Sequence, residues 1–155
     1  MKIDFKKTAV SLSQAQTAIF LSTQNQEEKG FNNPLLLKFK NKIDEKKLSL
    51  AISKAVNNHP GLFSSVFIDK DGLPKIKYNE EFAKKDICEI IEIDEKGFNK
   101  IKEKLIEPFD ITKDRLFRFK LFKSSECVRL FMDIHHIVFD GYSLKILLQS
   151  YLRFI

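Results

Sequence analysis

The chain has 155 residues, of which 43% are hydrophobic and 31% charged, with a formal net charge of +6. This composition is typical of one folded domain with an ordinary core, and it excludes a disordered or collagen-like chain. No stretch approaches the roughly 20 apolar residues of a membrane span, and the first residues lack the apolar segment of a signal peptide. We therefore expect a single domain over residues 1–155 that works in the cytoplasm and has no membrane partner.

The positive charge does not indicate a nucleic-acid partner. Recognition of phosphates and bases favours the planar guanidinium group of arginine, whereas most of the 27 basic residues here are lysines. We therefore expect these lysines to lie on solvent-exposed faces of helices and strands. Cys88 and Cys127 stand singly in apolar surroundings. This placement predicts two free thiols in a reducing compartment, not a disulfide.

The first half of the chain predicts helices alternating with strands. Ser13 and Asp44 are each placed to cap a helix whose apolar residues recur at helical spacing. The turn over residues 69–72 separates two apolar stretches and predicts a hairpin. The expected segments are a helix from Ser13 to about Gln24, a strand over 35–40, a helix from Asp44 to the stop at His59, and hairpin strands over 62–68 and 74–78.

The second half predicts a strand and a helix, then two antiparallel strands that lead into a final helix. The ranges are 87–93, 95–106, 115–122, 128–134 and 144–152. The mixture predicts an α/β (α+β) sandwich, in which a mixed, largely antiparallel sheet is covered by helices. Because the last helix has no stop signal, we expect the chain to be a piece of a longer polypeptide.

A histidine pair followed by Asp-Gly is the pattern that carries chemistry. His135 and His136 end an apolar strand, and Asp140 and Gly141 follow after three residues. Because adjacent strand residues point to opposite sides, one histidine can be buried while the other faces a cavity. Imidazole is well suited to proton transfer near neutral pH. The following helix would bring free amides and a positive dipole end close to the histidines, where a developing oxyanion could lie.

The two residues after the loop have supporting uses. Asp140 can brace the turn by accepting backbone or arginine hydrogen bonds, and Gly141 permits a tight turn or a close approach of substrate. A metal site fits less well, because adjacent strand residues cannot both reach one ion and no other His or Cys follows a ligand spacing. The pattern favours a histidine that acts on a nucleophile brought by the substrate. The alternative, that both histidines are ordinary core and surface residues, stays open.

These residues resemble the condensation domains of nonribosomal peptide synthetases. The signature of that family, two histidines, three variable residues, Asp and Gly, is matched in full by residues 135–141. Other segments are similar to the family pattern and occur in the family's order. They are residues 12–16, with Ser13 and Gln16, residues 59–62, which begin with His59, and residues 107–111 together with 116–118.

The resemblance implies one lobe, the N-terminal one, of a two-lobe fold similar to chloramphenicol acetyltransferase, with the C-terminal lobe absent. It implies amide formation between a donor thioester and an acceptor amine, both carried on phosphopantetheine arms of carrier proteins, with no cofactor or metal bound directly. The implied partners are peptidyl or acyl carrier proteins, an adenylation domain and the second lobe. The implied catalytic residue is His136, supported by His135, Asp140 and Gly141, with structural roles for Ser13, Gln16 and His59.

The match is incomplete in the second segment, where Phe63 stands in place of the family's usual arginine. The resemblance also implies that Asp140 pairs with an arginine outside the signature. In the family, the two lobes surround a tunnel that both substrates enter. We expect the isolated 155 residues to have little or no activity, because the second lobe that would complete this tunnel is missing. Two other interpretations stay open: a noncatalytic module that docks a carrier protein, and a coenzyme A-dependent acyltransferase of the related fold.

Overall fold

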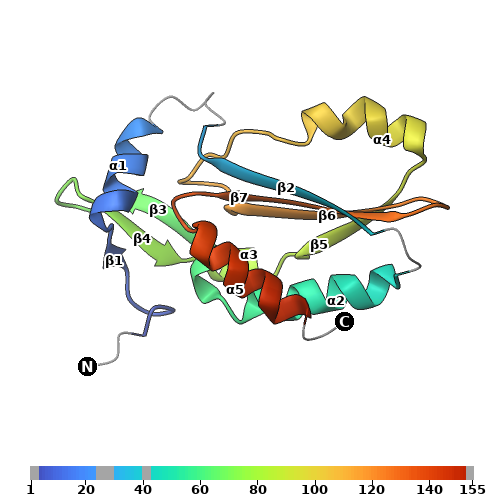
Figure 1. The fold of residues 1–155 in the computed structure, drawn as a ribbon. Helices are drawn as coiled ribbons and strands as arrows, with labels where there is room; N and C mark the ends of the chain where they lie inside the picture. The colour runs from blue at the N-terminus through green and yellow to red at the C-terminus, as the bar shows by residue number, and fades with distance from the viewer. Residues whose placement is uncertain (1–3, 24–29, 40–42, 153–155) are drawn as a thin grey trace.

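The computed structural model describes residues 4–23, 30–39 and 43–152, which form two β-sheets and the helices packed against them (Figure 1). The strands are β1 (Val10–Ser11), β2 (Asn32–Phe39), β3 (Ser64–Ile68), β4 (Pro74–Tyr78), β5 (Cys88–Glu92), β6 (Phe117–Lys123) and β7 (Val128–His135). The helices are α1 (Gln14–Ser22), α2 (Glu45–Asn57), α3 (Glu80–Ala83), α4 (Glu95–Ile101) and α5 (Gly141–Leu152), with short 3-10 turns η1 (Pro60–Phe63) and η2 (Lys102–Lys104). Gln24 and Lys40, the expected ends of the first helix and strand, lie outside the described residues.

The larger sheet has the strand order β2-β7-β6-β5. The β2–β7 and β6–β7 pairs are antiparallel and the β5–β6 pair is parallel, which confirms the expected mixed, largely antiparallel sheet. The predicted hairpin is also confirmed as β3 and β4, but it belongs to a separate three-stranded sheet with the order β1-β4-β3. The sequence did not predict β1, which has two residues and little periodicity to reveal it.

Helices cover both faces of the larger sheet, which confirms the predicted sandwich. Figure 1 shows α2 and α5 next to each other on one face and α4 on the other. Strand β7 is buried along its whole length, so its alternating side chains enter two different cores. Leu130 and Met132 belong to the core beneath α2 and α5, whereas Phe131 packs with Phe98 of α4.

The two predicted caps are present and explain where α1 and α2 begin. The Asp44 carboxylate accepts from the amides of Lys46 and Lys47, both at 3.0 Å. Ser13 and Gln16 form a capping box at the start of α1. The apolar stripe predicted for α2 is buried, and its members are Leu48, Ala51, Ile52, Ala55 and Val56.

Two boundaries differ from those predicted. Strand β2 begins at Asn32 and passes through Pro34, because one row of backbone groups in an edge strand needs no strand partner. The helix expected over 95–106 ends at Ile101 and continues as the tighter turn η2, a common way for a helix to finish. The residues that follow have no regular secondary structure up to Pro108, which disfavours helix at the residue before it.

Both cysteines are free thiols, as predicted. Cys127 is buried and Cys88 is half-buried, and burial raises the pKa of the Cys88 thiol to about 12. Within the residues that the structure describes, each helix is too short or too polar to cross a membrane.

Candidate active site

The histidine pair lies where β7 leaves the sheet, and both neighbouring strands hold its backbone. The His135 amide donates to the carbonyl oxygen of Leu116, just before β6, at 3.0 Å. The His136 amide donates to the carbonyl oxygen of Phe31, just before β2, at 2.8 Å. The signature loop, residues 136–140, then leads directly into α5. Two backbone hydrogen bonds, one from each side, therefore fix the position of the pair independently of its side chains.

His135 is the buried member, with 3% of its surface exposed. Its ring lies near the rings of Phe31 and Phe109, with centroids 6.2 and 5.9 Å away. Burial, helped by the charge of His136, lowers the pKa of His135 to about 4. Its Nδ1 accepts from the amide of Ile137 at 3.1 Å, so the neutral ring carries its proton on Nε2. The side chain is suited to supporting the loop and is poorly placed to exchange protons with a substrate.

His136 is the exposed member, and its ring has a defined orientation. Nδ1 lies 2.7 Å from the carbonyl oxygen of Phe139. Because a carbonyl oxygen only accepts, Nδ1 must carry a proton, and in the neutral ring Nε2 is left with the lone pair. The ring can therefore take up a proton at Nε2. The two adjacent histidines are held in opposite tautomers.

A cavity of about 370 Å³ lies at this ring, between the signature loop and the start of α1. The Gln16 Nε2 donates to the carbonyl oxygen of Ile137 at 2.9 Å, which ties the helix to the loop. Ser13 caps the same helix and also lines the cavity. The structure thus brings together His136 with Ser13 and Gln16, which are more than a hundred positions away in the sequence.

Asp140 caps α5 from within the loop. Its Oδ1 accepts from the amide of Ser143 at 2.8 Å and from the Ser143 hydroxyl at 2.7 Å, and these bonds lower the pKa of the carboxyl. The expectation of free amides facing an oxyanion is therefore wrong for Ser143, because the Asp140 carboxylate takes that donor. The backbone role expected for Asp140 is present. Within the described ranges no arginine contacts this carboxylate, and Phe63, at the family's arginine position, is buried in the core.

Gly141 does not have the positive φ that would require a glycine, and a Cβ at this position would meet open space. The backbone therefore does not require a glycine at this position, and close approach by a substrate stays a prediction. His59 lies on the other side of the loop, where it lines a separate cavity of about 280 Å³. Its buried Nε2 has no hydrogen-bond partner among the described residues. The structure does not bring His59 to the His136 cavity.

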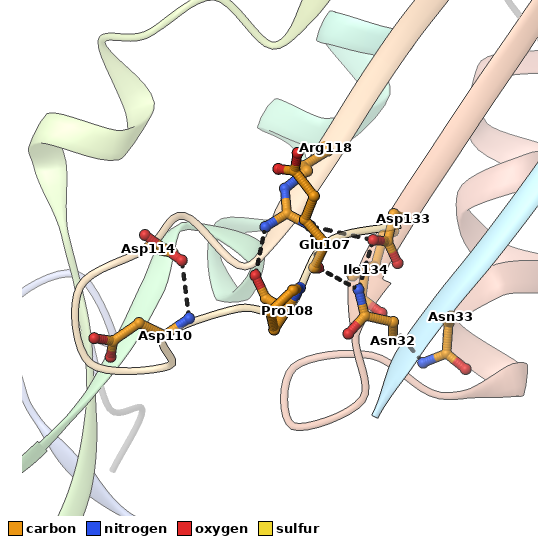
Figure 2. A network of polar contacts seen from close by, with 9 residues as sticks. All are labelled: Asn32, Asn33, Glu107, Pro108, Asp110, Asp114, Arg118, Asp133 and Ile134. Atoms are coloured by element: carbon orange, nitrogen blue, oxygen red, sulfur yellow. Dashed lines mark hydrogen bonds and ion pairs between the residues drawn. The ribbon is translucent and has the colours of Figure 1, made fainter. Parts of the chain in front are cut away.

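A buried polar network next to the histidine pair was missed by sequence reasoning (Figure 2). Asp133 of β7 lies opposite Arg118 of β6 in the strand register, and Asn32 of β2 contacts the same carboxylate. The signal that could have revealed it is one acidic residue inside an otherwise apolar strand, with an arginine in the strand expected to pair with it. In the described part of the chain, no three His, Cys, Asp or Glu side chains gather closely enough to hold a metal ion.

Comparison with known proteins adds family relationships. A model of the family described as "Condensation domain" matches residues 6–154. Bacitracin synthase 2 of Bacillus licheniformis is 30% identical over 152 residues, covering 94% of this chain and 6% of that protein. Tyrocidine synthase 3 of Brevibacillus parabrevis is 30% identical over 122 residues, covering 77% of this chain and 2% of that protein.

Solved structures show the same fold. The starter condensation domain of rhizomide synthetase superposes with a TM-score of 0.77 at 19% identity, covering 93% of this chain and 36% of that one. The first condensation domain of the CDA synthetase superposes with a TM-score of 0.78 at 17% identity, covering 95% of this chain and 40% of that one. The chain therefore spans a small part of its synthetase relatives and well under half of these solved domains.

Proposed function

The chain belongs to the condensation domain family, and from that premise we propose that it is the N-terminal lobe of a condensation domain in a nonribosomal peptide synthetase. In the complete domain it would contribute to an acyltransferase that forms amide bonds. The observation that carries this proposal is the exposed ring of His136, whose Nδ1 is engaged by Phe139 at 2.7 Å while Nε2 keeps its lone pair at the cavity. An imidazole held in this way is suited to receiving a proton from a visiting amine.

The reaction we propose joins two thioester-bound partners. The acceptor's amino group attacks the carbonyl carbon of the donor thioester, so that a C–N bond forms and the C–S bond breaks. The amine proton passes to His136 Nε2 and then to the departing thiolate, which leaves as the free thiol of the donor carrier. His136 also orients the attacking amine, and orientation alone lowers the barrier of such a step.

The other residues serve the loop and its surroundings. His135 fixes the loop through Ile137, Asp140 caps α5, and Gly141 leaves space for the substrate. Ser13 caps α1, Gln16 ties that helix to the loop, and the structural role proposed for His59 lies at the separate cavity on the other side of the loop.

The proposed partners follow from the family and from the share of the solved condensation domains that this chain covers. They are acyl or peptidyl carrier proteins, whose phosphopantetheine arms bring both substrates, an adenylation domain, and the C-terminal lobe that would close the tunnel. The first turn of α5 exposes an aromatic side chain next to the signature loop, Tyr142, with 73% of its surface free. Ile146, one turn further along the same face of α5, is 37% exposed, and these two apolar side chains together support the second lobe as a partner on that face.

The test is peptide formation by the complete synthetase that contains this chain, with both carriers loaded and the product measured by mass spectrometry. His136→Ala should reduce the rate by roughly 10²- to 10⁴-fold, the usual contribution of an acid–base residue, without changing the circular dichroism spectrum. Lys46→Ala, an exposed position on α2, is the matched control and should leave the rate unchanged. Full turnover by His136→Ala would contradict the proposal and favour the noncatalytic docking module.

A further inference from the structure

We propose that Arg118 is a positioning residue for His136, acting through the buried carboxylate of Asp133 and the segment over residues 107–109. This inference rests on the proposed function, because it assigns a supporting residue to the same histidine. Arg118 does not touch the His136 cavity; it acts from the adjacent strand through intermediate contacts.

The carboxylate of Asp133 is fully buried, three residues before His136. Its Oδ2 accepts from Asn32 Nδ2 at 2.7 Å and from Arg118 Nη1 at 3.3 Å (Figure 2). Its Oδ1 has no hydrogen-bond partner among the described residues. A buried ion pair contributes little net stability compared with apolar residues of similar size. Defined geometry at the end of β7, and not stability, is therefore the role that the proposal assigns to this pair.

Arg118 binds more than this carboxylate. Its Nη1 and Nη2 also donate to the carbonyl oxygens of Glu107 and Pro108, at 2.7 and 2.9 Å (Figure 2). Its guanidinium group lies over the ring of Phe109, 3.7 Å from the centroid. The planar group thus holds three consecutive residues of the segment against the sheet. A lysine has neither this fork of donors nor the flat face.

The contacts continue from this cluster to the histidine pair. Asn32 Nδ2 binds both the Asp133 carboxylate and the Glu107 carbonyl oxygen, which anchors the start of β2. The carbonyl oxygen of the preceding residue, Phe31, accepts a hydrogen bond from the His136 amide at 2.8 Å. On the other side, the ring of Phe109 meets the ring of His135 edge-on. Loss of the Arg118 contacts would therefore loosen the contacts that Phe31 and Phe109 make with the pair, whereas the hydrogen bond from the His135 amide to Leu116 would remain.

The same sheet provides a matched control at the opposite end of β7. Arg129 is 4% exposed, pairs with the carboxylate of Glu95 and lies over the ring of Phe98, 4.5 Å from the centroid. It therefore shares with Arg118 a carboxylate partner and an aromatic ring but, among the described residues, not the backbone carbonyl partners. Seven positions separate it from His136, which corresponds to about 23 Å along a strand.

The first experiment measures the tautomer of His136 by long-range ¹H–¹⁵N NMR of the histidine rings in this chain. The parent should show protonated Nδ1 and unprotonated Nε2. Arg118→Lys and the isosteric Asp133→Asn should each give a mixture of tautomers, whereas Arg129→Lys should keep the parent pattern. Thermal unfolding of each variant controls for general destabilisation. A parent-like ring in both Arg118→Lys and Asp133→Asn would overturn the proposal, as would an equal change in Arg129→Lys.

The second experiment measures peptide formation by the complete synthetase. Arg118→Lys should lower kcat by roughly 10- to 100-fold with KM unchanged, since small misplacements of a reacting group carry losses of this size. Arg129→Lys should retain the parent kcat. If His136→Ala is inactive but Arg118→Lys turns over like the parent, the positioning role is wrong and the proposed function stands. If His136→Ala is fully active, the proposed function fails, and the NMR result alone decides whether Arg118 orients the ring.

Discussion

The Nδ1 atom of His136 donates to the carbonyl oxygen of Phe139, three residues further along the same loop, across 2.7 Å. This bond closes the signature loop on itself and fixes the ring's rotation and its tautomer together. Its neighbour His135 accepts from the Ile137 amide at the corresponding atom, Nδ1. One loop therefore holds two identical side chains in opposite tautomers: His136 lines the cavity with its proton on Nδ1, and His135 is buried with its proton on Nε2.

This bond leads to a prediction for substitutions of His136. The amide nitrogen of asparagine can replace Nδ1 as the donor to Phe139, whereas alanine cannot. His136→Asn should therefore unfold within about 0.5 kcal/mol of the parent, and His136→Ala should lose about 1 kcal/mol, the usual net contribution of a hydrogen bond. Urea unfolding measures both. Both variants should form peptide at least roughly 10²-fold more slowly in the complete synthetase, so a parent-like rate in His136→Asn would contradict proton transfer at Nε2.

The lowered pKa of His135 predicts a pH dependence of stability. Burial keeps its folded-state pKa at about 4, against 6.5 when exposed. Between these values the unfolded chain binds a proton that the folded chain does not, so the free energy of unfolding should fall as the pH drops from 6.5 to 4. The loss from this group is about 3 kcal/mol. His135→Asn keeps an acceptor for the Ile137 amide but does not titrate, so its urea midpoint should fall less steeply over the same interval. Equal slopes would contradict the assignment.

The cap on α5 predicts different effects for two substitutions at one position. Asp140→Ala removes the acceptor for Ser143 and should lower the free energy of unfolding by about 1 kcal/mol, whereas Asp140→Ser, another good cap, should lose much less. Chemical denaturation of the two variants measures the difference. If serine destabilises as much as alanine, the aspartate has a role other than capping.

The hydrogen bond from Gln16 to Ile137 predicts that α1 stabilises the signature loop on the side of the His136 cavity. Gln16→Glu replaces the Nε2 donor with a carboxylate that faces a carbonyl oxygen, and it should destabilise the chain by about 1–2 kcal/mol. Gln14→Glu is the matched control, because it introduces the same charge in the first turn of the same helix, where a negative charge is stabilising by a few tenths of a kcal/mol. Thermal denaturation compares them. Similar midpoints for the two variants would show that the bond contributes little.

Local features of the fold could be predicted from the sequence because their causes are local. The cap and apolar stripe of α2, the hairpin and the antiparallel pair of β6 and β7 each depend on residues a few positions apart. The three-stranded sheet could not be predicted, because it includes β1, a strand of two residues that pairs with β4 across more than sixty positions. The start of β2 at Asn32 likewise depends on its partner β7 and not on its own residues.

At the candidate site, the sequence alone determined which residues are neighbours along the chain. His135 and His136 end an apolar strand, and Asp140 comes just before the next helix. Only the tertiary structure decided which ring is buried, which nitrogen of His136 is free, and that Asp140 binds Ser143. It also decided that Arg118 and Asp133 meet beneath the pair. The physical reason is that the burial of each histidine ring and the direction of its hydrogen bonds depend on residues such as Phe31 and Phe109. The fold brings these residues to the histidines from distant parts of the chain.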